Sequence, residues 1–258
     1  MTQAISCHWT ISDNFGDRIG PYLLSKITGK QVIWCEPNSD FEFYVVGGSI
    51  LNHINDRGIV WGAGLGNLTD GINPQASIKS VRGPYTRARA LSLGVQCPEV
   101  YGDPGLLLPR FYTPQSERGK YDVGIVPHYV DGYRAFNWFE NLHFIDVFQP
   151  IEKVIDEITS CKRIVSSSLH GIVVAHAYGI PAMWLKISDS IGGDGTKYRD
   201  HFASVGMEHV INPIDVREKK GMVFGHFTDC PDINTERLWR ACPVNQEFRL
   251  EKYRTKPE

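Results

Sequence analysis

The apolar residues of this chain fall into short runs rich in Val and Ile, which alternate with longer stretches whose apolar positions recur at helical spacing. Each short run ends in a cluster of Gly, Ser, Asn or Asp, as a buried strand does when it enters a turn. In the first part of the chain, this pattern predicts strands at 4–10, 31–35, 43–46, 59–61, 77–81 and 99–101, and helices at 18–28 and 85–93. Strands that alternate with helices indicate a parallel sheet covered on both faces.

The stretch 112–120 contains Pro114, Ser116 and Gly119 and is typical of a linker. The alternation then begins again, with strands at 121–126, 142–147, 163–166 and 182–187 and helices at 151–161, 169–178 and 197–205. We therefore predict an α/β fold of two doubly wound, Rossmann-like halves, residues 1–113 and 121–213. A tail, residues 214–258, follows them, and its periodicity is weaker.

Polar turns follow the predicted strands in both halves. In open parallel sheets, ligands bind beyond the carboxyl ends of the strands. The turns of the first half lie at 14–17, 47–49, 62–66, 82–83 and 103, and those of the second at 128, 166–170 and 189–199. Two such rims facing each other predict a cleft between the halves.

Composition narrows the class of protein. The 258 residues carry a formal net charge of −2 without a basic patch, so a nucleic-acid partner is not expected. The six cysteines form no C-x-x-C pair, no signal peptide is evident, and no apolar run approaches the length of a membrane span. These features predict a cytoplasmic protein. The nine histidines are scattered, which predicts no metal site.

The segment Ser166-Ser167-Ser168-Leu169-His170-Gly171 joins a predicted strand to a predicted helix. The start of a helix carries partial positive charge and unpaired N–H groups, so it is suited to binding an anion. His170 adds a side chain that exchanges a proton near neutral pH. The alternative interpretation is an ordinary serine N-cap without further function.

Four charged residues at the predicted rims each have two interpretations. Asp17 begins a helix, where it either stabilises the helix dipole or accepts a proton from a bound hydroxyl. Arg82 also precedes a helix, where a cation is unfavourable, so a contact with an anion would explain it. Lys197 and Arg199 follow a Gly-rich loop and are either solvated charges or anion ligands.

Two common enzyme classes are disfavoured. Gly62-Ala63-Gly64-Leu65-Gly66 is not the dinucleotide fingerprint, because the spacing of its glycines differs and no acidic residue follows at the expected distance. The chain also lacks the G-x-S-x-G elbow of serine hydrolases. Neither NAD nor a serine nucleophile is therefore expected.

Several short motifs, taken in order, resemble the polysaccharide pyruvyl transferase family, in its branch of ketal-forming pyruvyltransferases of bacterial exopolysaccharide synthesis. The resemblance covers residues 5–205 and rests on Asn14-Phe15-Gly16-Asp17, Gly47-Gly48-Ser49, Gly62-Ala63-Gly64-Leu65-Gly66, Ser80-Val81-Arg82-Gly83-Pro84, Gly102-Asp103-Pro104, Pro127-His128-Tyr129, the serine segment through Gly171, and Gly179-Ile180-Pro181. Each motif alone is weak, whereas their common order is specific.

The resemblance implies a glycosyltransferase B type fold and an enzyme that needs no cofactor or metal. Phosphoenolpyruvate would be the donor, bound mainly by the second half. The acceptor would be a sugar of a lipid-linked oligosaccharide, bound mainly by the first half. The products would be a pyruvate ketal on two sugar hydroxyls and free phosphate.

The chemistry assigns roles to the matching residues. His170 would be the general acid, and Asp17 the base on the acceptor side, with Asp103 as a weaker candidate for the base. The expected donor-binding residues are Ser167, Ser168, Leu169, Gly171, His128, Arg82, Lys197 and Arg199. The expected acceptor-binding residues are Asn14, Gly16, Gly48, Ser49 and Asp103.

The sequence departs from the family pattern at Ser168, where the family often has Arg before Leu-His. The cation that binds the donor would then come from Arg82, Arg163, Lys186, Lys197 or Arg199. Two other functions stay open, a nucleotide-sugar glycosyltransferase of the same fold and a non-catalytic carbohydrate-binding protein.

The tail mixes basic and aromatic residues, namely Trp239, Arg240, Phe248, Arg249, Lys252, Tyr253, Arg254 and Lys256. Such a segment either packs back on the first half or makes a peripheral contact with the anionic inner face of a membrane.

Overall fold

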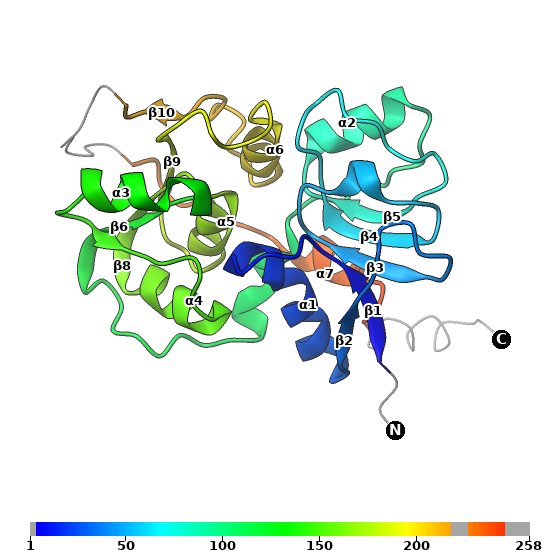
Figure 1. Ribbon diagram of the computed structural model, residues 1–258, viewed down its shortest axis with the longest axis horizontal. Helices are drawn as coiled ribbons and strands as arrows, with labels where there is room; N and C mark the ends of the chain where they lie inside the picture. Colours follow the sequence, from blue (N-terminus) through cyan, green and yellow to red (C-terminus); the bar gives the residue numbers. More distant parts are fainter. Residues whose placement is uncertain (1–3, 218–226, 246–258) are drawn as a thin grey trace.

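The computed structural model describes residues 4–217 and 227–245 (Figure 1). In these residues the strands form two separate sheets of five strands each, and every strand pair is parallel. The first sheet has the order β2-β1-β3-β4-β5 and the second the order β10-β9-β8-β6-β7. The predicted α/β fold with two Rossmann-like halves is confirmed.

The first sheet consists of β1 (Ile5–His8), β2 (Val32–Trp34), β3 (Phe43–Val46), β4 (Gly58–Ala63) and β5 (Ser77–Val81). The helices of this part are α1 (Phe15–Thr28) and α2 (Pro84–Ser92), with the 3₁₀ helices η1 (Leu51–His53) and η2 (Pro104–Arg110). Helix α1 ends at Gly29, which adopts the left-handed conformation that a glycine cap supplies.

The second sheet consists of β6 (Tyr121–Val126), β7 (His143–Phe144), β8 (Cys161–Ser166), β9 (Ala182–Lys186) and β10 (Ile214–Asp215). Its helices are α3 (Gly132–Trp138), α4 (Ile151–Thr159), α5 (Leu169–Ala177) and α6 (Thr196–Ser204), with the 3₁₀ helix η3 (Tyr129–Asp131). A last short helix, α7 (Glu236–Arg240), follows.

One predicted strand is wrong. Residues 99–101 contribute only a single bridge between Val81 and Tyr101. The chain then enters η2. The Asp103 side chain caps the first turn of this helix by accepting a hydrogen bond from the Gly105 backbone amide, and the ring of Pro104 restricts φ to a value that suits a helix. Helix α3 and strand β10 were not predicted, because neither shows a long periodic pattern.

The two halves share a hydrophobic core. Helix α1 stands between the sheets, and its Phe15, Ile19 and Leu23 belong to the same buried cluster as Ile155 and Val173 of the second half (Figure 1). Helix η2 adds Leu106 and Leu108 to that cluster. The position of the first sheet relative to the second is therefore fixed by apolar burial, the dominant favourable contribution to folding.

The described part of the tail contacts the first sheet. Leu238 and Cys242 are buried in a cluster with Cys7, Trp61 and Leu107, and the Trp61 indole donates to the Leu238 carbonyl at 2.9 Å. Phe248, Arg249, Lys252, Tyr253, Arg254 and Lys256 lie outside the described residues. Among the described residues, no helix has the length and hydropathy needed to span a membrane.

A buried ion pair also connects the halves. Arg82 follows β5 in the first half and Asp200 lies in α6 of the second, and both side chains are fully buried with Arg82 Nε 3.6 Å from Asp200 Oδ2. Asp200 also accepts hydrogen bonds from the amides of Tyr85 and Thr86 and from the Thr86 hydroxyl, at 2.9, 3.1 and 2.6 Å. A carboxylate of one half thus caps helix α2 of the other.

We predict that Asp200→Asn lowers the free energy of unfolding by about 3–5 kcal/mol, because it leaves the buried Arg82 charge without its partner. Urea denaturation followed by circular dichroism measures this loss. Asp189→Asn is the matched control, since Asp189 is exposed and its ion pairs lie in solvent. Equal losses in the two variants would contradict a structural role for the Arg82–Asp200 pair.

Candidate active site

A cavity of about 160 Å³ lies where the carboxyl ends of strands from both sheets meet. Its lining residues are Thr10, Asn14, Asp17, Gly48, Ser49, Ile50, His128, Tyr129, Ser168, Leu169, His170 and Lys197. The first half supplies the turns after β1 and β3, and the second half supplies the turns after β6 and β8 and the start of α6. Nine of the expected site residues meet here: Asn14, Asp17, Gly48, Ser49, His128, Ser168, Leu169, His170 and Lys197.

His170 lies in the first turn of α5 and is held between the two halves. Its Nε2 is 3.7 Å from Asp103 Oδ2, and the two side chains are 12% and 1% exposed. Asp103 Oδ1 is engaged by the Gly105 amide at 2.9 Å, whereas Oδ2 has no hydrogen-bond partner among the described residues. A contact with the sugar acceptor would require Asp103 to line the cavity. Asp103 is absent from the lining and instead contacts His170, which separates it from the cavity.

Gly16 has a steric role. A Cβ atom at this position would lie 2.3 Å from His170 Nδ1, well inside any permitted contact. Gly16 is absent from the cavity lining, so it is not placed to contact a ligand there. The missing side chain instead allows the His170 ring to pack against the first turn of α1.

The Asp17 carboxylate is oriented by its own loop. The Ser12 hydroxyl donates to Asp17 Oδ2 at 2.6 Å, and the side-chain nitrogen of Asn14, Nδ2, donates to the same oxygen at 3.1 Å. The side chain of Asn14 makes no cap to α1, although its position in the chain is that of an N-cap. Within the described residues both side-chain hydrogen bonds go to Oδ2, so they fix the orientation of the carboxylate from one oxygen.

The three serines have three different environments. The Ser166 hydroxyl donates to the carbonyls of Val126 and Ser168 at 2.7 and 2.8 Å and closes the turn. The Ser167 hydroxyl accepts from the His128 amide at 2.9 Å, so it positions His128 and does not line the cavity. Ser168 holds the N-cap position of α5 without making a side-chain cap and lines the cavity.

Gly171 also has a structural role. A side chain at this position would meet Ser166 Oγ and Val126, at 2.5 and 2.7 Å, so the glycine allows α5 to approach the sheet. It does not line the cavity, contrary to the expectation of a donor contact.

Arg82 does not reach the cavity either. Its guanidinium donates to the Ser49 hydroxyl and the Leu65 carbonyl at 2.8 and 2.6 Å, and its side chain is fully buried. Arg82 therefore fixes the wall of the cavity, including Ser49, and is not exposed to an anion there. Because the Arg82 side chain has no exposed surface, its expected role as a direct anion ligand would require the surrounding protein to move.

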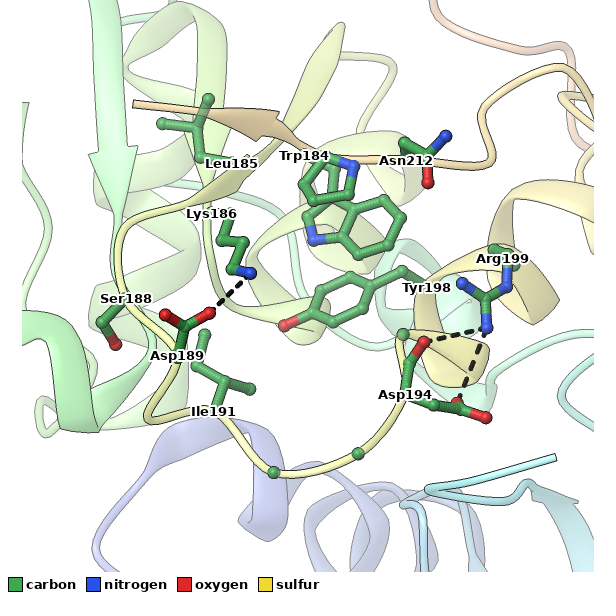
Figure 2. A pocket seen from close by; sticks show the side chains of 14 residues that line it. Trp184, Leu185, Lys186, Ser188, Asp189, Ile191, Asp194, Tyr198, Arg199 and Asn212 are labelled. Atoms are coloured by element: carbon green, nitrogen blue, oxygen red, sulfur yellow. Dashed lines mark hydrogen bonds and ion pairs between the residues drawn. The ribbon is translucent and has the colours of Figure 1, made fainter. Parts of the chain in front are cut away.

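The remaining candidate cations for donor binding lie in different parts of the structure. Arg199 donates to the Asp194 carbonyl at 2.9 Å and lines a second cavity (Figure 2). Lys186 is 2.6 Å from Asp189 in the same cavity, and Arg163 pairs with the exposed Asp122. Among these five cations, Lys197 is the one that the described structure places at the first cavity.

Two groups in the cavity have shifted pKa values. Burial, together with the Arg82 charge, lowers the pKa of Lys197 to about 8, although Asp17 acts in the opposite direction. Burial and the nearby Lys197 charge lower the pKa of His128 to about 4, so that ring is neutral at pH 7. Because His128 Nδ1 accepts from the Val130 amide, the proton of the neutral ring is on Nε2.

Three lining residues were not predicted as part of the site: Thr10, Ile50 and Tyr129. Each is next to, or at the end of, a segment that the sequence placed at a rim. Tyr129 stood in the motif Pro127-His128-Tyr129, whereas Thr10 and Ile50 were signalled only by their proximity in the chain to the end of β1 and to Ser49.

Comparison with known proteins shows a family relationship. The profile of the family described as polysaccharide pyruvyl transferase matches residues 21–189. An uncharacterised protein of Acanthamoeba polyphaga mimivirus is 31% identical over 219 residues, which cover 79% of this chain and 75% of that protein. The succinoglycan biosynthesis protein ExoV of Rhizobium meliloti is 30% identical over 154 residues, which cover 57% of this chain and 47% of ExoV.

A solved structure supports the fold. A functionally uncharacterised protein of Klebsiella pneumoniae superposes with a TM-score of 0.51 and covers 82% of this chain and 92% of that protein. The sequence identity is 10%, so this likeness concerns the arrangement of the elements alone.

We predict that Gly16→Ala displaces the His170 ring and lowers the free energy of unfolding by about 1–3 kcal/mol, because the added methyl overlaps Nδ1. The ring position is followed by the NMR signals of ¹³C-labelled histidine, assigned with a His170→Gln variant. Gly71→Ala is the control, since a Cβ there meets nothing within 4 Å. An unchanged His170 signal in Gly16→Ala would contradict the described packing.

Proposed function

The chain belongs to the polysaccharide pyruvyl transferase family, and we propose that it forms a cyclic ketal by moving pyruvate from phosphoenolpyruvate onto two hydroxyls of a sugar, with release of phosphate. The observation that carries this proposal is the meeting of His170, Asp17, Lys197 and Ser168 in one cavity between the halves. These residues come from far apart in the sequence, and together they supply an acid, a base, a cation and an anion-binding turn.

The donor needs a site for its phosphate and carboxylate groups. Ser168 and the first amides of α5 offer hydrogen-bond donors at a helix start, where the dipole favours negative charge. Lys197 adds a positive charge at the same cavity, in the role that the usual arginine before Leu-His would have. Phosphoenolpyruvate is thus proposed to bind mainly to the second half.

The first chemical step protonates the donor and adds the sugar. Protonated His170 gives its proton to C3 of phosphoenolpyruvate, which makes C2 electrophilic. A sugar hydroxyl forms a C–O bond to C2 while Asp17 takes the hydroxyl proton. The product is a tetrahedral carbon at C2 that carries methyl, carboxylate, phosphate ester and sugar oxygen.

The second step closes the ring. The C2–O bond to phosphate breaks, the electron pair leaves with the phosphate, and a second sugar hydroxyl forms the second C–O bond. His170, neutral after the first step, takes the proton of the second hydroxyl, and the proton held by Asp17 leaves with the phosphate, so the protons balance and both residues return to their starting states.

Asp103 is proposed to be a positioning residue for His170. Its buried carboxylate lies 3.7 Å from Nε2 of the ring, where it would hold the orientation of the imidazole. Gly16 lets the ring pack against α1 on its Nδ1 side, where the side chain of a larger residue would overlap the ring.

The acceptor is proposed to be a sugar of a polysaccharide repeat unit, presented as a lipid-linked oligosaccharide at the inner face of the membrane. The name of ExoV, a succinoglycan biosynthesis protein, supports a role in polysaccharide synthesis. The two facing sheets, with a cavity between them, support a glycosyltransferase B type arrangement. Asn14, Gly48 and Ser49 from the first half would contact the acceptor.

The direct test mixes the protein with phosphoenolpyruvate and a panel of synthetic glycosides, and follows phosphate release and the mass of the sugar product. We expect His170→Gln to lower turnover by about 10²–10⁴-fold, as the loss of a general acid does. The exposed His209→Gln is the matched control. Product formation from nucleotide sugars in place of phosphoenolpyruvate would favour a glycosyltransferase instead, and wild-type turnover in folded His170→Gln would refute the assigned acid.

A second prediction concerns pH. Lys197 attracts the donor anion only when protonated, so its contribution is present below its pKa of about 8 and is lost as the pH rises through that value. We therefore expect the KM for phosphoenolpyruvate to rise above about pH 8 in the wild type and to rise less in Lys197→Arg, because arginine stays charged. The same alkaline rise in both proteins would show that another group governs donor binding.

A further inference from the structure

A second, larger cavity lies in the second half and is not used by the proposed chemistry. It measures about 310 Å³ and lies at the carboxyl end of β9, bordered by the loop 188–195 and by the start of α6 (Figure 2). Cavities of this size are typical of small-molecule sites. Its place at the end of a parallel strand is also where such folds bind ligands.

One wall of this cavity is flat and apolar. The rings of Trp184 and Tyr198 stack with their centroids 4.3 Å apart and their planes 14° from parallel. Leu185 and Ile191 also line the cavity (Figure 2). Pro213 belongs to the same lining. Trp184 and Tyr198 are 7% and 3% exposed, so only a small apolar part of them reaches the cavity, and it suits the C–H groups of a sugar ring.

The polar side chains of the cavity point to an uncharged ligand. Lys186 Nζ lies 2.6 Å from Asp189 Oδ1, and Arg199 Nη2 lies 3.6 Å from Asp194 Oδ1 (Figure 2). The two cations and two carboxylates of the lining therefore neutralise each other. An anion would meet a carboxylate beside each of these cations and be repelled by it, whereas a hydroxyl can donate to the carboxylate and accept from the cation.

Hydrogen bonds connect the lining of this cavity to the serine turn of the first cavity and to the first half of the chain. The Tyr198 hydroxyl donates to the Ser167 carbonyl at 2.7 Å, so this ring stands between the second cavity and the serine turn of the first. Lys197, the adjacent residue, lines the first cavity. The loop itself is tied to the first half, because Asp194 Oδ2 accepts from the Leu68 amide at 3.0 Å.

From the apolar wall, the paired charges and the position beside the catalytic cavity, we infer that the second cavity is a carbohydrate subsite that binds a neutral sugar of the acceptor glycan other than the sugar that reacts. This inference rests on the proposed function for the identity of the glycan. Arg199, expected from the sequence to bind the donor, would then contact acceptor hydroxyls, together with Asp194 and Asn212.

Binding is tested without donor and without turnover. The full chain, labelled with 5-fluorotryptophan, is titrated with cellobiose, lactose and gentiobiose while ¹⁹F NMR follows Trp184, whose signal is assigned with Trp184→Phe. At least one disaccharide should shift the Trp184 signal saturably. Asn212→Phe, which adds bulk at the exposed rim, should weaken that binding by about tenfold or more, whereas Asn141→Phe, on an exposed turn before β7, should not.

Parallel titrations use inorganic phosphate and uridine diphosphate as probes. If either shifts Trp184 and no disaccharide does, the site binds an anion or a nucleotide and the inference is wrong. If no probe shifts Trp184, or if Asn212→Phe binds the disaccharide as tightly as wild type, the inference is also wrong. Phosphate release with simple glycosides is measured separately on the unaltered protein, so failure of the subsite and failure of the proposed reaction can be told apart.

Discussion

The buried contact between Arg82 and Asp200 is the constraint on which the rest of the structure depends. It connects the end of β5 to α6 with both charges removed from water, and removal of either partner would leave an uncompensated charge in the interior. The same arginine donates to Ser49 in the cavity wall, and the same aspartate caps α2. Within the apolar packing that positions the two sheets, this ion pair connects the halves and fixes Ser49 in the wall of the cavity between them.

The cavity that results combines groups whose environments differ. His170 has a buried carboxylate at one nitrogen and a glycine beside the other, whereas His128 is kept neutral by burial and by the charge of Lys197. The two histidines of this cavity therefore differ in their partners, and for His128 the result is a neutral ring that carries its proton on Nε2. The difference is decided by their neighbours and not by the imidazole itself.

The sequence by itself determined the parallel sheets and the places where the site residues would gather. Apolar runs and Gly-rich turns are local features, and β3, β5 and β6 were predicted with the bounds that the structure shows. The carboxyl ends of parallel strands lie on one edge for geometrical reasons, so Asp17, His128, Ser168 and His170 could be assigned to one cleft before any coordinates were known. The family motifs gave the chemistry that these residues were expected to perform.

Only the tertiary structure decided what each side chain does within that edge, because burial and partners come from residues distant in the chain. Arg82 and Lys197 both appeared as candidate anion ligands, yet Asp200 and backbone carbonyls enclose the first while the second remains at the cavity. Ser167 and Ser168 are adjacent and chemically identical, but one hydroxyl is engaged by the His128 amide and the other lines the cavity. The periodicity of the sequence determines where a residue lies along a helix or strand. The partner of its side chain depends on how the two halves pack together, and the local sequence does not encode that packing.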